Sequence, residues 1–209
     1  MQIAGYVRIV LGIPGILKCM EHRHAIVEEK RTGALFEYYT LLYFLLALAG
    51  WLWEVLLYFV TEHAWINRGV YRGPYLPIYG IGGTLLCLFL YCWRNRPLVV
   101  FFISAVSCAA LEYAASFFLE EKWGIRWWDY SGHFLNIQGR ICLLSTVAFG
   151  IGGVFLVCFF LPLYNKLYEK MSDKWRRLLM LILLLVFTVD AAYCAMNPNV
   201  GYGITESKL

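Results

Sequence analysis

Charged residues are scarce in this chain of 209 residues: Asp, Glu, Lys and Arg make up 15% of it, and 61% is hydrophobic. A soluble domain averages about 25% charged residues and cannot bury so large an apolar share. A disordered chain needs the opposite composition. The composition therefore excludes both classes. It indicates a protein that spans a membrane several times, with aromatic residues anchoring it at the interfaces.

Motifs for several kinds of chemistry are also missing. The sequence has no G-x-x-x-x-G-K-S/T, so the chain does not hydrolyse ATP through a P-loop. None of its seven cysteines forms a C-x-x-C pair or a zinc spacing with His, so we expect small packed side chains, no metal and no cofactor. Lys and Arg do not cluster beside stackable aromatics, which argues against a nucleic-acid partner.

Long apolar runs predict five transmembrane helices. About 20 apolar residues cross a bilayer, and the second run is shorter than this. The runs cover residues 39–60, 78–93, 98–119, 141–161 and 178–196. The sequence therefore predicts an all-α polytopic membrane protein.

The segment before the first run is too polar for a sixth span, because Arg8, Pro14 and Lys18 interrupt it. Within it, residues 16–31 mix apolar and charged side chains at helical spacing, which predicts a helix on the membrane surface or packed in the cytoplasm. The predicted regions are a cytoplasmic or interfacial segment 1–36, a five-span membrane domain 37–198 and a C-terminal tail 199–209.

The distribution of Lys and Arg predicts the orientation. With the N-terminus inside, twelve of the 18 Lys and Arg residues fall in inner segments and six in outer ones. Inner loops carry the excess of positive charge in membrane proteins. We therefore expect a cytoplasmic N-terminus and an external C-terminus.

The two halves of the membrane domain share a pattern. Glu54 in the first span precedes an outer loop with Asn67-Arg68 and then a Gly-Ile-Gly-Gly run. Glu112 in the third span precedes a loop with Asn136 and Arg140 and a second Gly-Ile-Gly-Gly run. The pattern indicates a parallel internal repeat, spans 1–2 with 3–4, and a chance match of short features is the alternative.

Three acids lie inside spans at one depth: Glu54, Glu112 and Asp190. Each is about 10 Å below the outer surface at the rise of an α-helix. A charge at the bilayer centre costs about 2.5–3.5 kcal/mol on insertion scales, so such residues are paired or face an aqueous cavity. We expect one shared polar pocket open to the outside.

The outer loops supply the counter-charges, Arg68, Arg72 and Arg140. A guanidinium binds carboxylates or phosphates through a two-pronged fork. The arginines would line a binding pocket, or they would only neutralise Glu54, Glu112 and Asp129.

Gly73, Pro74 and Pro77 exclude a continuous helix in the first outer loop. The segment is therefore either a re-entrant loop that turns into the pocket or an ordinary surface loop. In the second loop Asp129 lies close to Ser131 and His133. We reject a hydrolase triad there, because residues so close in sequence rarely align as nucleophile and base.

Both loops resemble a known family in their motifs. These are Gly50-Trp51 with Glu54, Asn67-Arg68-Gly69, Gly73-Pro74, Pro77-Ile78-Tyr79-Gly80, Glu112, Trp128-Asp129-Tyr130-Ser131 and Asn136-Ile137-Gln138-Gly139-Arg140-Ile141. They resemble the membrane-protein family described as "Putative ABC-transporter type IV", or CmpB-like, over about residues 39–161. The resemblance implies a multi-pass protein of the bacterial plasma membrane that acts as a transporter permease.

The leading hypothesis is a permease, which would need a separate ATPase subunit docked on the inner segment 161–177 and, being small, a homodimer in the lipid membrane. The alternatives are a membrane-embedded enzyme acting on a phosphate-bearing lipid head group, and an accessory or sensor protein. An enzyme is the weaker reading, since no hydrolase motif is present. The candidate pocket residues are Glu54, Asn67, Arg68, Arg72, Gly73, Pro74, Pro77, Tyr79, Glu112, Trp128, Asp129, Tyr130, Asn136 and Arg140.

Overall fold

The computed structural model describes residues 32–201 and 204–205 of the chain. The surface helix predicted before residue 32 lies outside these residues. So does part of the C-terminal tail.

The named secondary-structure elements of the described residues are all helices, as predicted. Its elements are α3 (Thr32–Glu62), α4 (Pro77–Leu90) with a 3-10 turn η1 (Tyr91–Trp93), α5 (Pro97–Trp123), α6 (Leu143–Phe155), a π-helical segment η2 (Leu156–Phe160), α7 (Leu161–Lys170) and α8 (Asp173–Met196). Four helical stretches are long and apolar enough to cross a membrane: Gly33–Glu62, Pro97–Trp123, Leu143–Lys170 and Asp173–Met196. The shorter apolar helix Pro77–Trp93 is the second predicted span, so the five-helix prediction is confirmed.

Proline and glycine set several helix boundaries. Pro77 and Pro97 stand in the first turns of α4 and α5, where the missing N–H costs nothing. Gly124 ends α5 in the left-handed conformation, with φ 67°. Pro162 removes the donor for the Cys158 carbonyl one turn earlier, which accounts for the π-helical segment between α6 and α7.

The two Gly-Ile-Gly-Gly runs pack against the preceding span in the same register. A methyl group added at Gly80 would lie 2.7 Å from the Tyr43 ring, and one added at Gly150 would lie 2.5 Å from the Phe101 ring. Each glycine thus lets two helices approach closely over an aromatic side chain. Tyr43 and Phe101 are 58 residues apart, the same separation as Glu54 and Glu112.

The last glycine of each run repeats the relationship about one turn later. Gly83 faces Leu46, and Gly153 faces Ser104. Leu46 and Ser104 are again 58 residues apart. The pairs α3–α4 and α5–α6 therefore share one packing register. These two pairs of matching glycine contacts are the packing expected if the second helix pair is a duplicate of the first.

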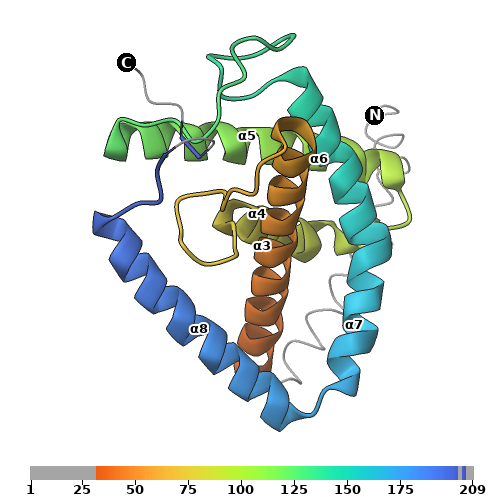
Figure 1. The fold of residues 1–209 in the computed structure, drawn as a ribbon. Helices are drawn as coiled ribbons and strands as arrows, with labels where there is room; N and C mark the ends of the chain where they lie inside the picture. Colours follow the sequence, from red (N-terminus) through yellow and green to blue (C-terminus); the bar gives the residue numbers. More distant parts are fainter. Residues whose placement is uncertain (1–31, 202–203, 206–209) are drawn as a thin grey trace, which may run out of the picture.

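The core joins five of the helical elements. Buried side chains of α3, α4 and α7 form one cluster: Leu41, Leu42, Leu46, Cys87, Leu161, Tyr164 and Tyr168. A second cluster joins α4, α5 and η2: Leu86, Leu90, Val100 and Val157. In Figure 1, α3 lies between α8 on one side and the continuous α6–α7 helix on the other.

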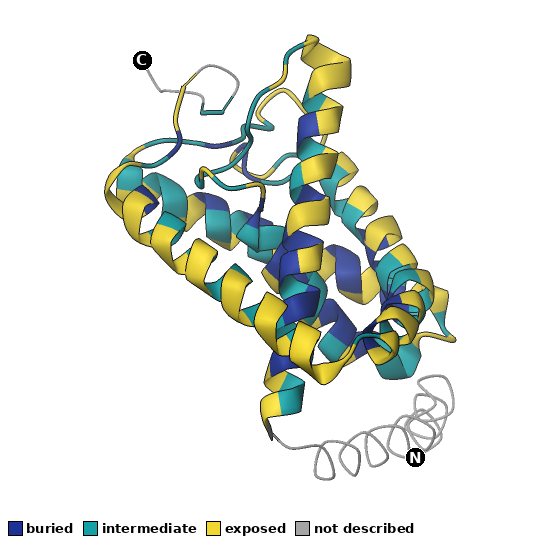
Figure 2. Ribbon diagram, turned by 60° about the horizontal axis from the view of Figure 1, so that its bottom comes forward, coloured by how far each residue is buried: buried dark blue, intermediate teal, exposed yellow. Residues whose placement is uncertain are grey.

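Helix α8 is the least covered of the spans. Phe187 attaches it through ring contacts with Tyr43, Phe44, Tyr71 and Tyr75, at centroid distances of 5.4–6.2 Å. Its opposite face is exposed and apolar along most of the helix, which Figure 2 shows as a yellow stripe. Such a face suits contact with lipid chains rather than water.

The cysteine prediction holds for five described residues and fails for one. Cys87, Cys108, Cys142, Cys158 and Cys194 are free thiols, buried or half-buried in the helical bundle. Cys92 is disulfide-bonded, so the expectation of packing alone is wrong there. A disulfide depends on the distance between two chain segments, which cysteine spacing does not reveal.

Candidate functional site

Asn67 fixes the shape of the first outer loop. Its side-chain amide donates to the Arg72 carbonyl at 2.7 Å and to the Tyr71 carbonyl at 3.5 Å, and its oxygen accepts from Trp51 Nε1 at 2.6 Å. The loop therefore folds back on itself and stays attached to α3. Pro74 and the Arg72 side chain are exposed, so Arg72 is not the buried counter-charge that the sequence predicts.

Asn136 fixes the shape of the second outer loop. Its amide donates to the carbonyls of Ser131 and His133 at 3.1 and 2.9 Å, and its oxygen accepts from the Gly139 N–H at 3.1 Å. Ile137 and Ile141 form a short antiparallel bridge beside it. The two repeated asparagines thus shape the loops and do not project into a pocket.

Glu54 is held by one residue of α4 and one of the first loop. The Tyr79 hydroxyl donates to Glu54 Oε1 at 2.6 Å, and Arg68 Nε lies 3.8 Å from Glu54 Oε2. The Arg68 guanidinium also lies over the Tyr58 ring, 5.2 Å from its centroid. The Arg68–Glu54 ion pair is the one that sequence reasoning anticipated.

Glu112 is more deeply buried, with 5% of its surface exposed. The Tyr130 hydroxyl donates to its Oε1 at 3.0 Å, and the Ser145 hydroxyl donates to its Oε2 at 3.1 Å. Tyr130 belongs to the second loop and Ser145 to the first turn of α6. The carboxylate of the second half therefore also receives one donor from its loop and one from the next helix.

The two carboxylates belong to one cluster. Burial raises the pKa of the Tyr130 phenol, and the nearby carboxylates of Glu112 and Glu54 raise it further. Tyr79 likewise interacts electrostatically with Glu54, Tyr130 and Glu112. We call this group the carboxylate cluster and define it as Glu54, Arg68, Tyr79, Glu112, Tyr130 and Ser145.

Arg140 binds an acid that the sequence analysis did not single out. Its Nη2 lies 2.7 Å from Glu120 Oε2, and its Nη1 donates to Ser116 at 3.2 Å. Arg126 Nε donates to the same Glu120 oxygen at 3.0 Å. Glu120 lies eight residues after Glu112 on one face of α5, a spacing that could have identified it.

The guanidinium of Arg140 is also enclosed by rings. It lies 5.3 Å from the centroid of Phe117 and 5.7 Å from that of Tyr113, and 10% of its side chain is exposed. Trp128 Nε1 donates to the Arg140 carbonyl at 3.0 Å and so holds its backbone. Arg140 and Glu120 thus form a largely buried ion pair in this structure.

Asp129 shapes a turn. Its Oδ1 accepts from the Ser131 N–H at 2.9 Å and from the Ser131 hydroxyl at 2.6 Å, and Arg126 Nη1 lies 3.7 Å away. A methyl group at Gly139, which has φ +67°, would collide with this turn. The geometry gives Ser131 the role of a turn donor to Asp129.

Asp190 binds the first loop, whereas the sequence placed it with Glu54 and Glu112. Its Oδ2 accepts from the Gly73 N–H at 3.0 Å and from the Tyr75 hydroxyl. Burial, followed by this hydrogen bond, raises the pKa of Tyr75. Asp190 therefore anchors α8 to the loop that precedes α4, and Gly73 is used for its backbone N–H.

Asn199 connects both loops to the segment after α8. Its amide donates to the carbonyls of Asn67 and Gly69 at 2.9 and 3.0 Å, and its carbonyl accepts from Trp127 Nε1 at 3.3 Å. It is 4% exposed. No sequence motif marks this residue, because its partners are backbone atoms of distant segments.

A second buried acid, Glu37, ties three helices at the opposite end of α3. It is 6% exposed, accepts from the Tyr168 hydroxyl at 3.1 Å, and lies 3.9 Å from the Nε atoms of Arg176 and Arg177. The Arg176 guanidinium stacks 4.4 Å from the Tyr168 ring. In the sequence, Arg176 and Arg177 indicated only the orientation of the chain, and their pairing with Glu37 was not predicted.

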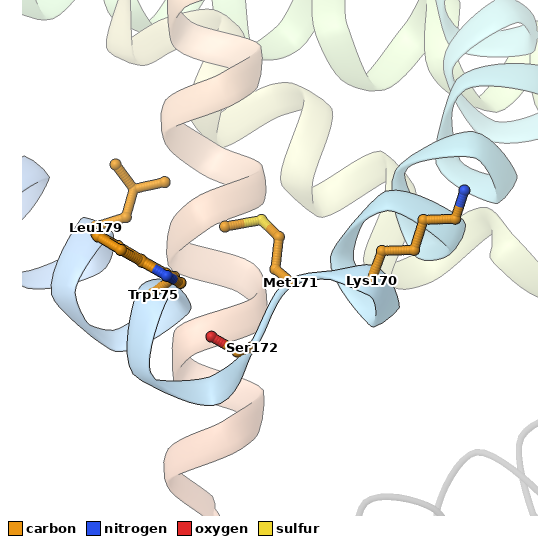
Figure 3. Close-up of a pocket in the computed structure, with 5 residues that line it drawn as sticks. All are labelled: Lys170, Met171, Ser172, Trp175 and Leu179. Atoms are coloured by element: carbon orange, nitrogen blue, oxygen red, sulfur yellow. The ribbon is translucent and has the colours of Figure 1, made fainter.

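Two hollows lie at the turn between α7 and α8, and predicted site residues line neither. One, of about 500 Å³, is lined by Lys170, Met171, Ser172, Trp175 and Leu179 (Figure 3). The other, of about 400 Å³, is lined by Asp173, Lys174, Arg177, Leu178 and Leu181.

In the carboxylate cluster the polar groups bind one another. Among residues 32–201 and 204–205, no group of three His, Cys, Asp or Glu residues is arranged to hold a metal.

Comparison with known proteins gives one match. The family model described as "Putative ABC-transporter type IV" matches residues 41–195. This match includes α8 and Asp190, which the resemblance noted from the loop motifs did not reach. The comparisons with curated proteins and with solved structures give no match. Because the matched segment is most of the chain, the protein belongs to the Putative ABC-transporter type IV family.

Proposed function

We propose that this chain is the membrane-spanning permease of a transporter and that the carboxylate cluster is where its solute binds. Membership of a family named for ABC transporters supports a transport role. Four helices able to cross a membrane, with a shorter fifth, support a multi-pass protein. The bacterial plasma membrane and a cytoplasmic N-terminus remain part of this proposal.

The observation that carries the proposal is that Glu54 and Glu112 both lie close enough to Tyr130 to act on it electrostatically. Each comes from an equivalent position of a repeated helix pair, and each accepts hydrogen bonds from a loop or helix of its own half. Transporters built from repeats place their sites at the interface between the repeats. A movement of α4 away from α3, or of the second loop and α6 away from α5, would separate the hydroxyls from the carboxylates and free acceptors for a solute.

The chemistry of the cluster favours one class of solute. The cluster holds two carboxylates and one arginine, Arg68, which pairs with Glu54, while Arg140 is paired with Glu120. Carboxylates accept hydrogen bonds and attract cations. A solute with a positive charge or several hydroxyl donors therefore fits better than an anion.

Energy for transport would come from another subunit. The chain has no P-loop motif, so we propose a separate ATPase and, in view of the small number of spans, a homodimer. The segment predicted as the docking loop, 161–177, is mostly the end of a span in α7. Only Met171 and Ser172 separate α7 from α8.

The enzyme alternative receives less support from the geometry. A lipid-phosphate enzyme would use Arg68 and Arg140 to clamp the phosphate. Arg68 lies against Glu54, and Arg140 is bound to Glu120 and Ser116. Both guanidinium groups would have to leave a carboxylate before they could bind a phosphate.

The proposal is tested by purifying the full chain from native membranes in mild detergent and identifying what comes with it. We expect a nucleotide-binding subunit in near-stoichiometric amount and ATP hydrolysis in the eluate. Glu112→Gln should lower that hydrolysis, whereas Glu121→Gln, an exposed acid on the same helix, should not. A protein that purifies without an ATPase, or a complex indifferent to Glu112→Gln, would favour the accessory or sensor reading.

The orientation has its own test. A cysteine placed at Thr205 should react with a membrane-impermeant maleimide in intact cells, since the Lys and Arg distribution predicts an external C-terminus. Labelling that appears only after permeabilisation would reverse the orientation.

A further inference from the structure

The hollow at the turn between α7 and α8 lies where two spans end. It is lined by Lys170, Met171, Ser172, Trp175 and Leu179 and has a volume of about 500 Å³ (Figure 3). The helical stretches Leu143–Lys170 and Asp173–Met196 both reach it. It therefore opens at a membrane interface, and none of its residues belongs to the carboxylate cluster.

The rim of the hollow is suited to an anion. Lys170 supplies an exposed basic side chain. Ser172 is the N-cap of the 24-residue helix α8, and its side chain makes no capping hydrogen bond. The first N–H groups of a helix have no partner within the helix, and its dipole favours negative charge there. A cation, a hydroxyl and several amide donors thus meet at one point.

The floor of the hollow is suited to a hydrocarbon chain. Trp175 is 63% exposed and Leu179, one helical turn deeper in the span, is 41% exposed. In Figure 3 both lie on the same side of α8, facing Met171 across the turn. This apolar slot continues into the exposed face of α8, and Trp is the residue typical of the lipid head-group level.

Two acids flank the rim in sequence, Glu169 beside Lys170 and Asp173 beside Ser172, and neither lines the hollow. Asp173 lies in the first turn of α8, but its carboxylate is paired with Arg176. Asp173 lines the second hollow, with Lys174 and Arg177, and not the first. Arg176 in turn is shared with the buried Glu37 and does not line the first hollow.

We propose that this hollow binds an anionic phospholipid, independently of what the carboxylate cluster carries. The phosphate would accept hydrogen bonds from Lys170, from the Ser172 hydroxyl and from the first amides of α8, while an acyl chain would lie along Trp175 and Leu179. A soluble phosphate could use only the rim. Because the apolar floor is continuous with the lipid-facing side of α8, the structure favours a lipid.

The test uses the full-length protein, delipidated in a neutral detergent, with lipid binding followed by native mass spectrometry. Phosphatidylglycerol should bind more tightly than phosphatidylcholine. Lys170→Gln should weaken phosphatidylglycerol about fivefold, the effect of one cation near an anionic lipid surface. Lys166→Gln removes the same charge one turn earlier on α7, outside the hollow, and should leave binding unchanged. Lys170→Arg keeps the charge and should bind as the unaltered protein does.

Three results would overturn the proposal. The first is equal binding of phosphatidylglycerol and phosphatidylcholine. The second is an equal effect of Lys170→Gln and Lys166→Gln, or a loss with Lys170→Arg as large as with Lys170→Gln. The third is displacement of the lipid by millimolar inorganic phosphate with no dependence on Trp175→Ala, which would mark a site for a free anion.

Discussion

The Tyr79 hydroxyl donates a hydrogen bond of 2.6 Å to Glu54, from the first turn of α4 to the outer part of α3. The equivalent residue of the second helix pair is Phe149, whose ring lies 6.4 Å from that of Tyr79 and has no hydroxyl. Glu112 instead takes its donors from Tyr130 and Ser145. The two halves thus share a packing register and differ in how they satisfy the carboxylate.

Tyr79→Phe should therefore destabilise the protein by about 1.5 kcal/mol, because a hydrogen bond to a charged group is lost at a half-buried site. A melting curve in detergent measures the effect. Tyr193→Phe removes a hydroxyl from an exposed position on α8 and should leave the melting temperature unchanged. Equal melting temperatures for Tyr79→Phe and the unaltered protein would show that the bond contributes nothing.

Glycine substitutions should separate close packing from helix propensity. Gly80→Ala places a methyl group 2.7 Å from the Tyr43 ring and Gly150→Ala places one 2.5 Å from the Phe101 ring, so each should cost about 1–3 kcal/mol. Gly152→Ala has open space within 4 Å and should be neutral or stabilise by up to about 1 kcal/mol. Thermal unfolding of the three variants under one condition is the measurement. A destabilising Gly152→Ala together with a harmless Gly80→Ala would contradict the register described for α3 and α4.

Arg140 and Glu120 should show strong coupling in a double-mutant cycle. Their atoms lie 2.7 Å apart and both side chains are at most 16% exposed, so removing either leaves a poorly solvated charge. Arg140→Ala and Glu120→Gln should each destabilise, and the double variant should recover about 1–3 kcal/mol relative to their sum. Additive losses would mean that the pair is not formed in the membrane.

Alkaline pH should test Tyr130. Burial, the Glu112 carboxylate and the hydrogen bond to it raise the pKa of Tyr130 above its ordinary value of about 10. A group whose pKa is higher in the folded state stabilises fully below the unfolded pKa, and this contribution is lost as pH rises above it. Stability should hold to about pH 10 and then fall, more steeply than in Tyr130→Phe. Identical pH profiles for the two proteins would show that Tyr130 is not buried against carboxylates.

The helices and their repeat could be predicted from the sequence because they depend on local composition. Apolar runs, Pro77 and Pro97 at helix starts, and the Gly-Ile-Gly-Gly runs all act within one or two turns. The Arg68–Glu54 pair was also predictable, since the loop that follows a span can reach back to it.

The other partnerships depend on how helices rotate and where loops return. Arg140 meets Glu120 and not Glu112, and Asp190 meets Gly73 and Tyr75 on a loop more than 100 residues earlier. Glu37 accepts a hydrogen bond from Tyr168, which lies 131 residues later in the chain. Side-chain pairing between distant segments leaves no periodic signal in one sequence.

The central claim is that Glu54 and Glu112 act together on one solute. The most direct measurement is ATP hydrolysis by the purified transporter complex, reconstituted in lipid, for Glu54→Gln, Glu112→Gln and the double variant. If both carboxylates serve one site, each single variant should lose most of the transport-coupled activity and the double variant should lose little more, because groups that act as a unit are not additive. Independent, multiplicative losses, or activity unchanged in all three variants, would contradict the account.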